Sequence, residues 1–179
     1  NALKLSVLNF WKKKGKPSKL IMSFHGIPKK SLYQGDPYHC ECHKTGRLLA
    51  EALNLKESEY KICFQSRFGK AEWLKPYFSE VIKDLGKQKT KNLHVICPGF
   101  SSDCLETLEE INMEGKSIFL ENGGKNYDYI PALNNNSYWI ESMGEILNSN
   151  LQGWIDQKWS LVNQQKKSAL TKKQAEKFK

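Results

Sequence analysis

The residue with the clearest chemical potential is His25, which ends the apolar run Leu20–Phe24 and is followed by Gly26 and Pro28. An apolar run bounded by glycine and proline is typical of a buried strand. In a parallel sheet the carboxyl ends of the strands face the ligand crevice. We therefore predict an imidazole at the mouth of a cleft, able to bind a metal ion or to accept a proton near neutral pH. The alternative is a packed histidine satisfied by a backbone carbonyl.

Three carboxylates, Asp103, Glu106 and Glu110, follow another apolar run, Leu93–Cys97, and so open at the same edge. Spacings of three and four residues place them on one face of a predicted helix. A row of carboxylates beside an imidazole can hold a divalent cation or relay protons released by a substrate. The alternative is a solvated acidic face whose charge matches the helix N-terminus.

The run His39–His43 holds two histidines and two cysteines, but its geometry is poor for a metal. On a helix, Cys-x-Cys points its two sulfurs about 200° apart. The second Cys/His pair of a structural zinc site is also missing. We expect these residues to begin a helix. Two further cysteines, Cys63 and Cys97, lie in apolar runs, so a reducing compartment is expected rather than a disulfide framework.

Short apolar runs alternate with stretches of helical periodicity. The strand candidates are Leu20–Phe24, Tyr60–Gln65, Leu93–Cys97 and Ser117–Leu120. The helix candidates are 38–54, 73–85, 103–113 with Leu105 and Leu108 toward the core, and a last helix through 139–147. This alternation predicts an α/β fold, a four-stranded parallel sheet with helices on both faces, plus an N-terminal lead-in helix and a C-terminal helix and tail.

The formal net charge of +9 is unevenly distributed: residues 1–35 carry +8, residues 36–157 carry −5 and residues 158–179 carry +6. We interpret 1–16 as a lead-in helix and linker from a missing N-terminal domain, 17–157 as the α/β domain, and 158–179 as a basic, partly disordered tail. Basic flanks around an acidic middle argue against a nucleic-acid protein and leave contact with an anionic membrane surface as an option. No stretch is long and apolar enough to span a membrane. No dinucleotide fingerprint, phosphate loop or nucleophile elbow is present, which argues against dehydrogenases, kinases and hydrolases.

Five blocks, in order over residues 20–140, together resemble the ferrochelatase family. They are Ser23–Pro28, Gly35–Tyr38, Phe64–Gly69, Trp73–Pro76 and Asp103–Leu108. The resemblance implies a chelatase-like fold of two similar α/β halves that clamp a porphyrin, of which this chain is similar to the second. It also implies insertion of Fe(II) into protoporphyrin IX with release of two protons, the last step of haem synthesis. The alternative is a related chelatase acting on coproporphyrin or inserting cobalt.

The resemblance also implies roles for single residues. It makes His25 and Glu106 the catalytic and iron-binding pair, Asp103 and Glu110 an acidic relay, and Trp73, Ser66 and Gln65 porphyrin contacts. Cys104 stands where some members carry a histidine. Iron is then a substrate, no cofactor is held permanently, and the cysteine spacing argues against an iron–sulfur cluster. The implied partners are the porphyrin, ferrous iron and the missing N-terminal half, with no nucleic acid, in the cytoplasm and with peripheral membrane contact as an option.

Overall fold

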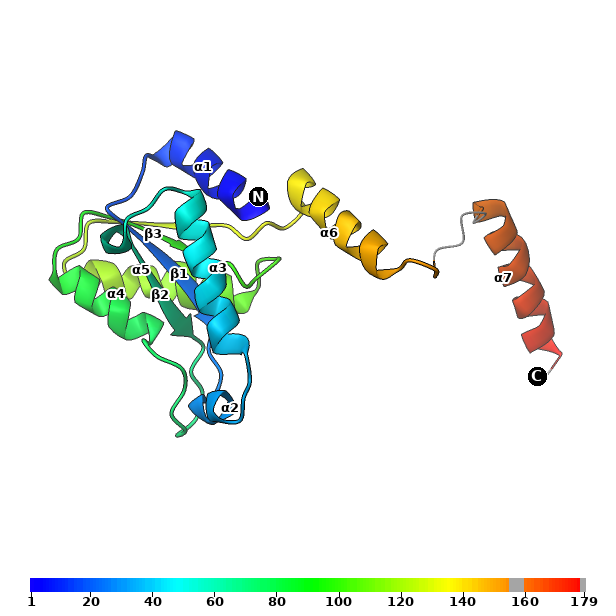
Figure 1. Cartoon of the computed structure of the whole chain (residues 1–179), viewed down its shortest axis with the longest axis horizontal. Helices are drawn as coiled ribbons and strands as arrows, with labels where there is room; N and C mark the ends of the chain where they lie inside the picture. Colours follow the sequence, from blue (N-terminus) through cyan, green and yellow to red (C-terminus); the bar gives the residue numbers. More distant parts are fainter. Residues whose placement is uncertain (155–159, 178–179) are drawn as a thin grey trace. The chain divides into compact units, whose positions relative to one another are not determined.

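The computed structural model describes residues 1–154 and 160–177. The chain divides into two units, Asn1–Trp139 and Ile140–Lys179 (Figure 1). The first unit is built on four parallel strands in the order β2-β1-β3-β4. The strands are β1 (Lys19–His25), β2 (Tyr60–Gln65), β3 (Asn92–Ile96) and β4 (Asn126–Ile130). The predicted four-stranded parallel sheet is confirmed.

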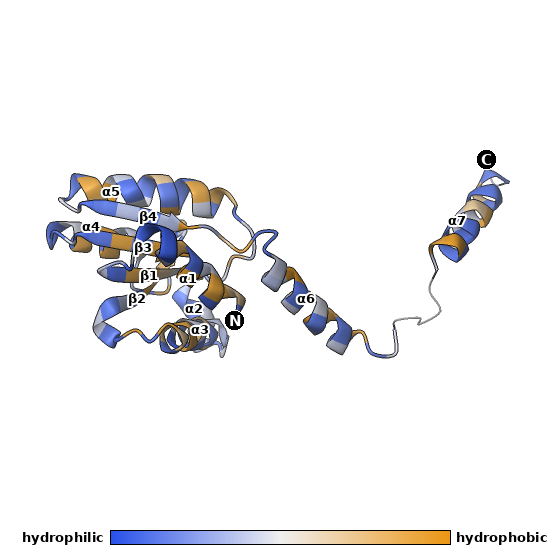
Figure 2. Ribbon diagram, turned by 90° about the horizontal axis from the view of Figure 1, so that it is seen from above, coloured by the Kyte–Doolittle hydropathy of each residue, from blue (hydrophilic) through white to orange (hydrophobic). Residues whose placement is uncertain are grey.

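Helices cover both faces of this sheet (Figure 2). One face carries α1 (Ala2–Lys14) and α3 (Tyr38–Ala52), and the other carries α4 (Phe78–Lys87) and α5 (Gly115–Glu121). The remaining elements are α2 (Lys29–Tyr33), a 3-10 turn η1 (Glu57–Glu59), a π-helix η2 (Glu106–Glu114), α6 (Ser137–Asn150) and α7 (Leu161–Glu176). None of the described helices is long and apolar enough to cross a membrane.

The unbroken apolar run in β1 follows from this double cover. Leu20, Met22 and Phe24 point into the core beneath α1 and α3, whereas Ile21 points into the core beneath α4 and α5. All residues of Leu20–Phe24 are buried, which is why the run does not alternate with polar residues.

The predicted strand Ser117–Leu120 is wrong, because these residues lie in α5. Phe119 is fully buried while Leu120 is 40% exposed, as expected for a helix with one covered side. A short apolar run cannot be assigned from periodicity alone. The true fourth strand, β4, buries Tyr127 and Tyr129 and leaves Asp128 half-buried between them, so its alternation is hidden among polar residues.

The start of α4 also differs from the prediction. The helix predicted over 73–85 begins only at Phe78, because Pro76 lies within the segment and cannot occupy a helix interior. Residues 166–176 of the predicted basic tail lie in α7, a helix with no buried residue, and the partial disorder of the tail stays a prediction. The predicted boundary between 157 and 158 falls outside the described residues.

The lead-in helix α1 packs over a buried histidine. His94 in β3 is 3% exposed, its ring meets Phe10 of α1 edge-on at 5.3 Å, and its Nε2 lies 3.8 Å from Asp128 Oδ2. Lys14 of α1 in turn lies 3.2 Å from Asp128 Oδ1. Nδ1 of His94 has no hydrogen-bond partner in the described part of the chain. Burial lowers the pKa of His94, Asp128 opposes this, and Lys14 adds to it.

This buried imidazole should make stability fall in mild acid. Below the ordinary pKa of 6.5 the unfolded chain binds a proton that the folded chain resists, so stability is complete above that pH and is lost as pH falls. The loss is at most about 1.4 kcal/mol per pH unit. Urea unfolding at about pH 7.5 and about pH 5.5 measures it. We expect His94→Leu to reduce the difference between the two pH values more than His43→Gln does, because burial lowers the pKa of both histidines but His94 is the more deeply buried. Equal reductions would contradict the assignment.

Candidate functional site

The predicted catalytic residues lie at the carboxyl ends of β1 and β3. The order β2-β1-β3-β4 makes this the point where connections leave the sheet in opposite directions, which is where open α/β sheets bind ligands. His25 is the last residue of β1, and its ring centroid lies 6.3 Å from that of Trp73 and 6.4 Å from that of Phe100. A Cβ at Gly26 would lie 3.0 Å from Trp73 Cε3, so glycine allows the indole to pack beside the histidine.

The two nitrogens of His25 have different surroundings. Nδ1 lies 2.6 Å from the carbonyl oxygen of Gly26, which can only accept a hydrogen bond, so the neutral ring carries its proton on Nδ1. Nε2 then presents a lone pair. The carbonyl of His25 accepts a hydrogen bond of 2.8 Å from the Tyr38 hydroxyl, which burial keeps protonated by raising the pKa of Tyr38. The alternative prediction was a packed histidine whose ring is satisfied by a backbone carbonyl. Such a carbonyl is present, but it accepts a hydrogen bond from Nδ1 only, and the Nε2 lone pair can still bind a metal ion or accept a proton.

Glu106 is the first residue of η2, and its backbone is held by a buried amide. Gln65, 2% exposed at the end of β2, donates from Nε2 to the carbonyl oxygen of Glu106 at 2.9 Å. The Cys97 thiol donates to the other end of the same amide at 3.4 Å. Hydrogen bonds from the Cys104 thiol and from its own backbone lower the pKa of Glu106, and His25 lowers it further when its ring is protonated. The structure thus brings the predicted pair, His25 and Glu106, to one edge of the sheet.

Asp103 does not join a carboxylate row. It precedes η2, and its Oδ1 accepts hydrogen bonds from the Tyr129 hydroxyl at 2.7 Å, the Thr107 hydroxyl at 3.1 Å and the Ala132 amide at 3.2 Å. Its Oδ2 accepts from Asn134 Nδ2 at 2.8 Å. Burial alone would raise the pKa of Asp103, but these hydrogen bonds outweigh it and the pKa lies below its usual value. Asp103 fixes the segment that follows β4.

The carboxylate of Glu110 also accepts hydrogen bonds, in this case from the loop that follows β2. Its Oε1 accepts from the backbone amide of Ser66 and its Oε2 from the Ser66 hydroxyl, both at 2.6 Å. Ser66 has a φ of 63°, a left-handed conformation that is uncommon outside glycine. The pair borders a pocket of about 240 Å³, which Arg67 and Glu114 also line. Glu110 therefore joins the π-helix to the loop that carries Trp73.

The prediction that Leu105 and Leu108 point to the core is wrong. They are 75% and 47% exposed, whereas Thr107 and Ile111 are fully buried. The prediction assumed 3.6 residues per turn, but η2 is a π-helix, whose wider turn changes which residues share a face. Single π turns are common at functional sites.

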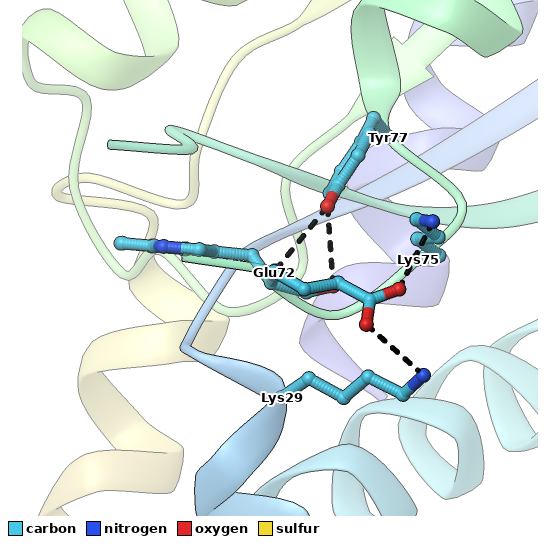
Figure 3. Close-up of polar contacts among 5 residues, drawn as sticks. Lys29, Glu72, Lys75 and Tyr77 are labelled. Atoms are coloured by element: carbon cyan, nitrogen blue, oxygen red, sulfur yellow. Dashed lines mark hydrogen bonds and ion pairs between the residues drawn. The ribbon is translucent and has the colours of Figure 1, made fainter. Parts of the chain in front are cut away.

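The loop around Trp73 is tied to α2 by charged side chains. Figure 3 shows Glu72 between two lysines, with Oε2 3.3 Å from Lys29 and Oε1 3.0 Å from Lys75. The Tyr77 hydroxyl lies 3.2 Å from the backbone nitrogen and 3.4 Å from the carbonyl oxygen of Trp73. Exposed ion pairs add little stability, but together these contacts restrict where the indole lies.

The run His39–His43 starts at the second residue of α3, so these residues begin a helix, as predicted. The two imidazole rings lie 4.4 Å apart, and both pack near Phe64. Within the described residues, no group of three or more histidine, cysteine or acidic side chains is arranged to hold a metal ion.

Three residues of the site were not predicted from the sequence. Tyr38 acts on a backbone carbonyl, Phe100 flanks the imidazole, and Tyr129 comes from the strand that was missed. Phe100 had a usable signal, because it follows an apolar run that ends at the same edge as His25. Tyr129 had none, since its partner Asp103 lies 26 residues away.

Comparison with known proteins gives consistent matches. A family model described as Ferrochelatase matches residues 1–151. A ferrochelatase of Nitrosomonas europaea is 60% identical over 159 residues, covering 89% of this chain and 44% of the relative. Ferrochelatases of Methylobacillus flagellatus and Chromobacterium violaceum are 59% and 57% identical over 155 residues each, covering 87% of this chain and 45% and 43% of those relatives. The chain thus spans less than half the length of the curated relatives it matches.

The contact between Ser66 and Glu110 can be tested with Ser66→Ala, which removes the hydroxyl donor and keeps the backbone amide. A hydrogen bond to a charged group contributes about 1.5–3 kcal/mol, so we expect a loss of that size in the free energy of unfolding. Amides of residues 66–77 should also exchange hydrogen faster. Ser79→Ala, at an exposed serine of the same pocket, is the control. A similar loss in both variants would contradict the role of this contact.

Proposed function

Because this chain belongs to the ferrochelatase family, we propose that the complete protein inserts Fe(II) into protoporphyrin IX and releases two protons to form protohaem. The observation that carries the proposal is the Nδ1 hydrogen bond of His25, which leaves the Nε2 lone pair for chemistry, together with the electrostatic influence of His25 on the carboxylate of Glu106. The chain supplies one side of the cleft, and we propose that the other side belongs to the part of the complete protein that precedes it.

The reaction needs a base and a ligand pair at the same place. Two pyrrole N–H protons must leave the macrocycle as the iron enters, and the iron must give up bound water. The Nε2 lone pair of His25 is suited to accept a pyrrole proton or to bind the incoming iron. The lowered pKa keeps Glu106 as a carboxylate at neutral pH, and a histidine with a carboxylate is a ligand pair suited to Fe(II).

The other predicted site residues divide into contacts and supports. We propose that Trp73 contacts the face of the macrocycle and that Ser66 borders its rim, with Phe100 as an added aromatic wall. Gln65 is buried, so we propose that it acts by holding the backbone of Glu106 and not by touching the porphyrin.

We propose another role for the two members of the acidic relay predicted from the sequence, Asp103 and Glu110. The carboxylates of Asp103 and Glu110 are occupied by internal hydrogen bonds, so we assign both to support of the π-helix. Proton release would then run through His25 and Glu106.

We propose that iron enters as substrate and that the reaction uses no resident cofactor. The five cysteines are spread over α3, β2, the residue after β3 and the segment before η2, which is a poor framework for an iron–sulfur cluster. The alternative substrates remain coproporphyrin and cobalt. Parallel assays of the complete protein with Fe(II) or Co(II), and with protoporphyrin or coproporphyrin, distinguish them.

His25→Ala in the complete protein should reduce iron insertion by about 100-fold or more, since it removes the base. Glu106→Gln should also reduce it, because the carboxylate ligand is lost. Loss of protoporphyrin fluorescence under anaerobic conditions with Fe(II) measures the rate. Glu109→Gln, an exposed glutamate of the same π-helix, is the control and should retain activity. Near-normal insertion by His25→Ala would overturn the mechanism.

We further propose that the complete protein is cytoplasmic and contacts membranes peripherally through the basic flanks of this chain. Residues 1–35 carry +8 and residues 158–179 carry +6, and such segments attract anionic lipid. Flotation with vesicles that contain phosphatidylserine should bring the protein to the top of the gradient, and salt should release it. Absence of protein from the lipid fraction at low salt would refute this contact.

A further inference from the structure

Two histidines four residues apart lie on the same side of α3. His39 is the second residue of this helix and His43 is the sixth. At 100° per residue, a spacing of four places two side chains about 40° apart around the helix axis. The centroids of the two imidazole rings are 4.4 Å apart, with the ring planes tilted by 46°. Because both residues belong to one helix, their pairing does not depend on how the two units of the chain are placed.

A buried aromatic ring supports both imidazoles. Phe64 in β2 is 1% exposed, and its ring centroid lies 5.8 Å from that of His39 and 6.1 Å from that of His43. The ring of His39 is nearly parallel to that of Phe64, at 21°. Both histidines are half-buried. An apolar floor of this kind limits the positions that the two rings adopt and the access of water to them.

The spacing of the two rings is close to that needed to hold a metal ion between them. A zinc ion lies about 2.0–2.1 Å from an imidazole nitrogen and therefore about 3.2 Å from the ring centroid. Two imidazoles in neighbouring coordination positions, at about 90–109°, then have centroids about 4.5–5.2 Å apart. The observed 4.4 Å is just below this range, so small side-chain rotations suffice. Histidines at this spacing on one helix face also bind zinc in the H-E-x-x-H motif.

The ligands offered by this segment are the two nitrogens and not the two sulfurs. Cys42 is buried, and a hydrogen bond links its thiol to Tyr38, whereas Cys40 is exposed. Burial and the ring of His39 lower the pKa of His43, so its imidazole keeps a lone pair at neutral pH. Within the described residues, no third histidine, cysteine or acid is arranged to complete the set. Water would therefore fill the remaining coordination positions.

We propose that His39 and His43 form a binding site for a borderline divalent cation such as Zn(II) or Cu(II), separate from the pair His25 and Glu106. Neutral imidazole suits these ions, and Cu(II) should bind more tightly than Zn(II). The ion would clamp the first two turns of α3, the segment whose Tyr38 hydroxyl holds the carbonyl of His25. The inference goes beyond the proposed reaction and does not depend on it.

The test measures Zn(II) binding to the complete protein by competition with a chromophoric chelator. The parent for this experiment carries His25→Ala and Glu106→Gln, so that ions in the cleft do not contribute. Adding His39→Gln or His43→Gln should each weaken Zn(II) binding by about tenfold or more, because one of two ligands held at high effective concentration is lost. Unchanged binding in these two variants would overturn the proposal.

A change of register is the matched control. His43→Gln combined with Lys44→His keeps the number of histidines but moves the second imidazole by about 100° around the helix, so it should not restore binding. Lys44→His alone keeps the original pair and should bind Zn(II) as the parent does. Restored binding in the combined variant would overturn the proposal, because the geometry of the pair would then be irrelevant.

Hydrogen exchange locates the bound ion. Zn(II) should slow amide exchange of residues 40–47 by about tenfold or more in the parent, and should not do so in the combined register variant. Slowing that is equal in both proteins, or absent from α3 in the parent, would overturn the assignment. A wild-type complete protein that binds Zn(II) through this pair but inserts no iron would refute the proposed function and leave this site in place.

Discussion

A backbone carbonyl oxygen 2.6 Å from Nδ1 of His25 accepts a hydrogen bond and can donate none, which fixes the proton on the inner nitrogen. The proposed chemistry of His25 depends on this constraint, because only then does Nε2 offer a lone pair. The Tyr38 hydroxyl holds the carbonyl of His25, and the Trp73 indole packs where Gly26 has no side chain. The imidazole is thus oriented by backbone contacts that a sequence does not display.

The second half of the site depends on the winding of η2. A π-helix has more residues per turn than an α-helix, so the residues that share a face differ. In η2, Thr107 and Ile111 are buried, whereas Leu105 and Leu108 are exposed. Gln65 anchors the first residue of this helix by the carbonyl of Glu106. The three carboxylates therefore do not act as one row. Asp103 and Glu110 accept hydrogen bonds from neighbouring segments, and Glu106 is the member placed with His25 at the edge of the sheet.

The first unit, Asn1–Trp139, has a core that is covered on both sides. Both faces of the sheet are covered by helices, and α1 seals His94 beneath Phe10.

The sequence alone determined the α/β class, three of the four strands and the position of His25 at a strand end, because burial on both faces leaves an unbroken apolar run. It did not determine the fourth strand, since β4 hides its alternation among polar residues while the apolar run Ser117–Leu120 belongs to α5. Nor did it determine the orientation of the carboxylates. Asp103 is held by Asn134, and Glu110 by Ser66, 44 residues away. Periodicity reports the buried side of an element only if its winding is regular, and hydrogen bonds between distant residues leave no local pattern, so these features were decided by the tertiary structure.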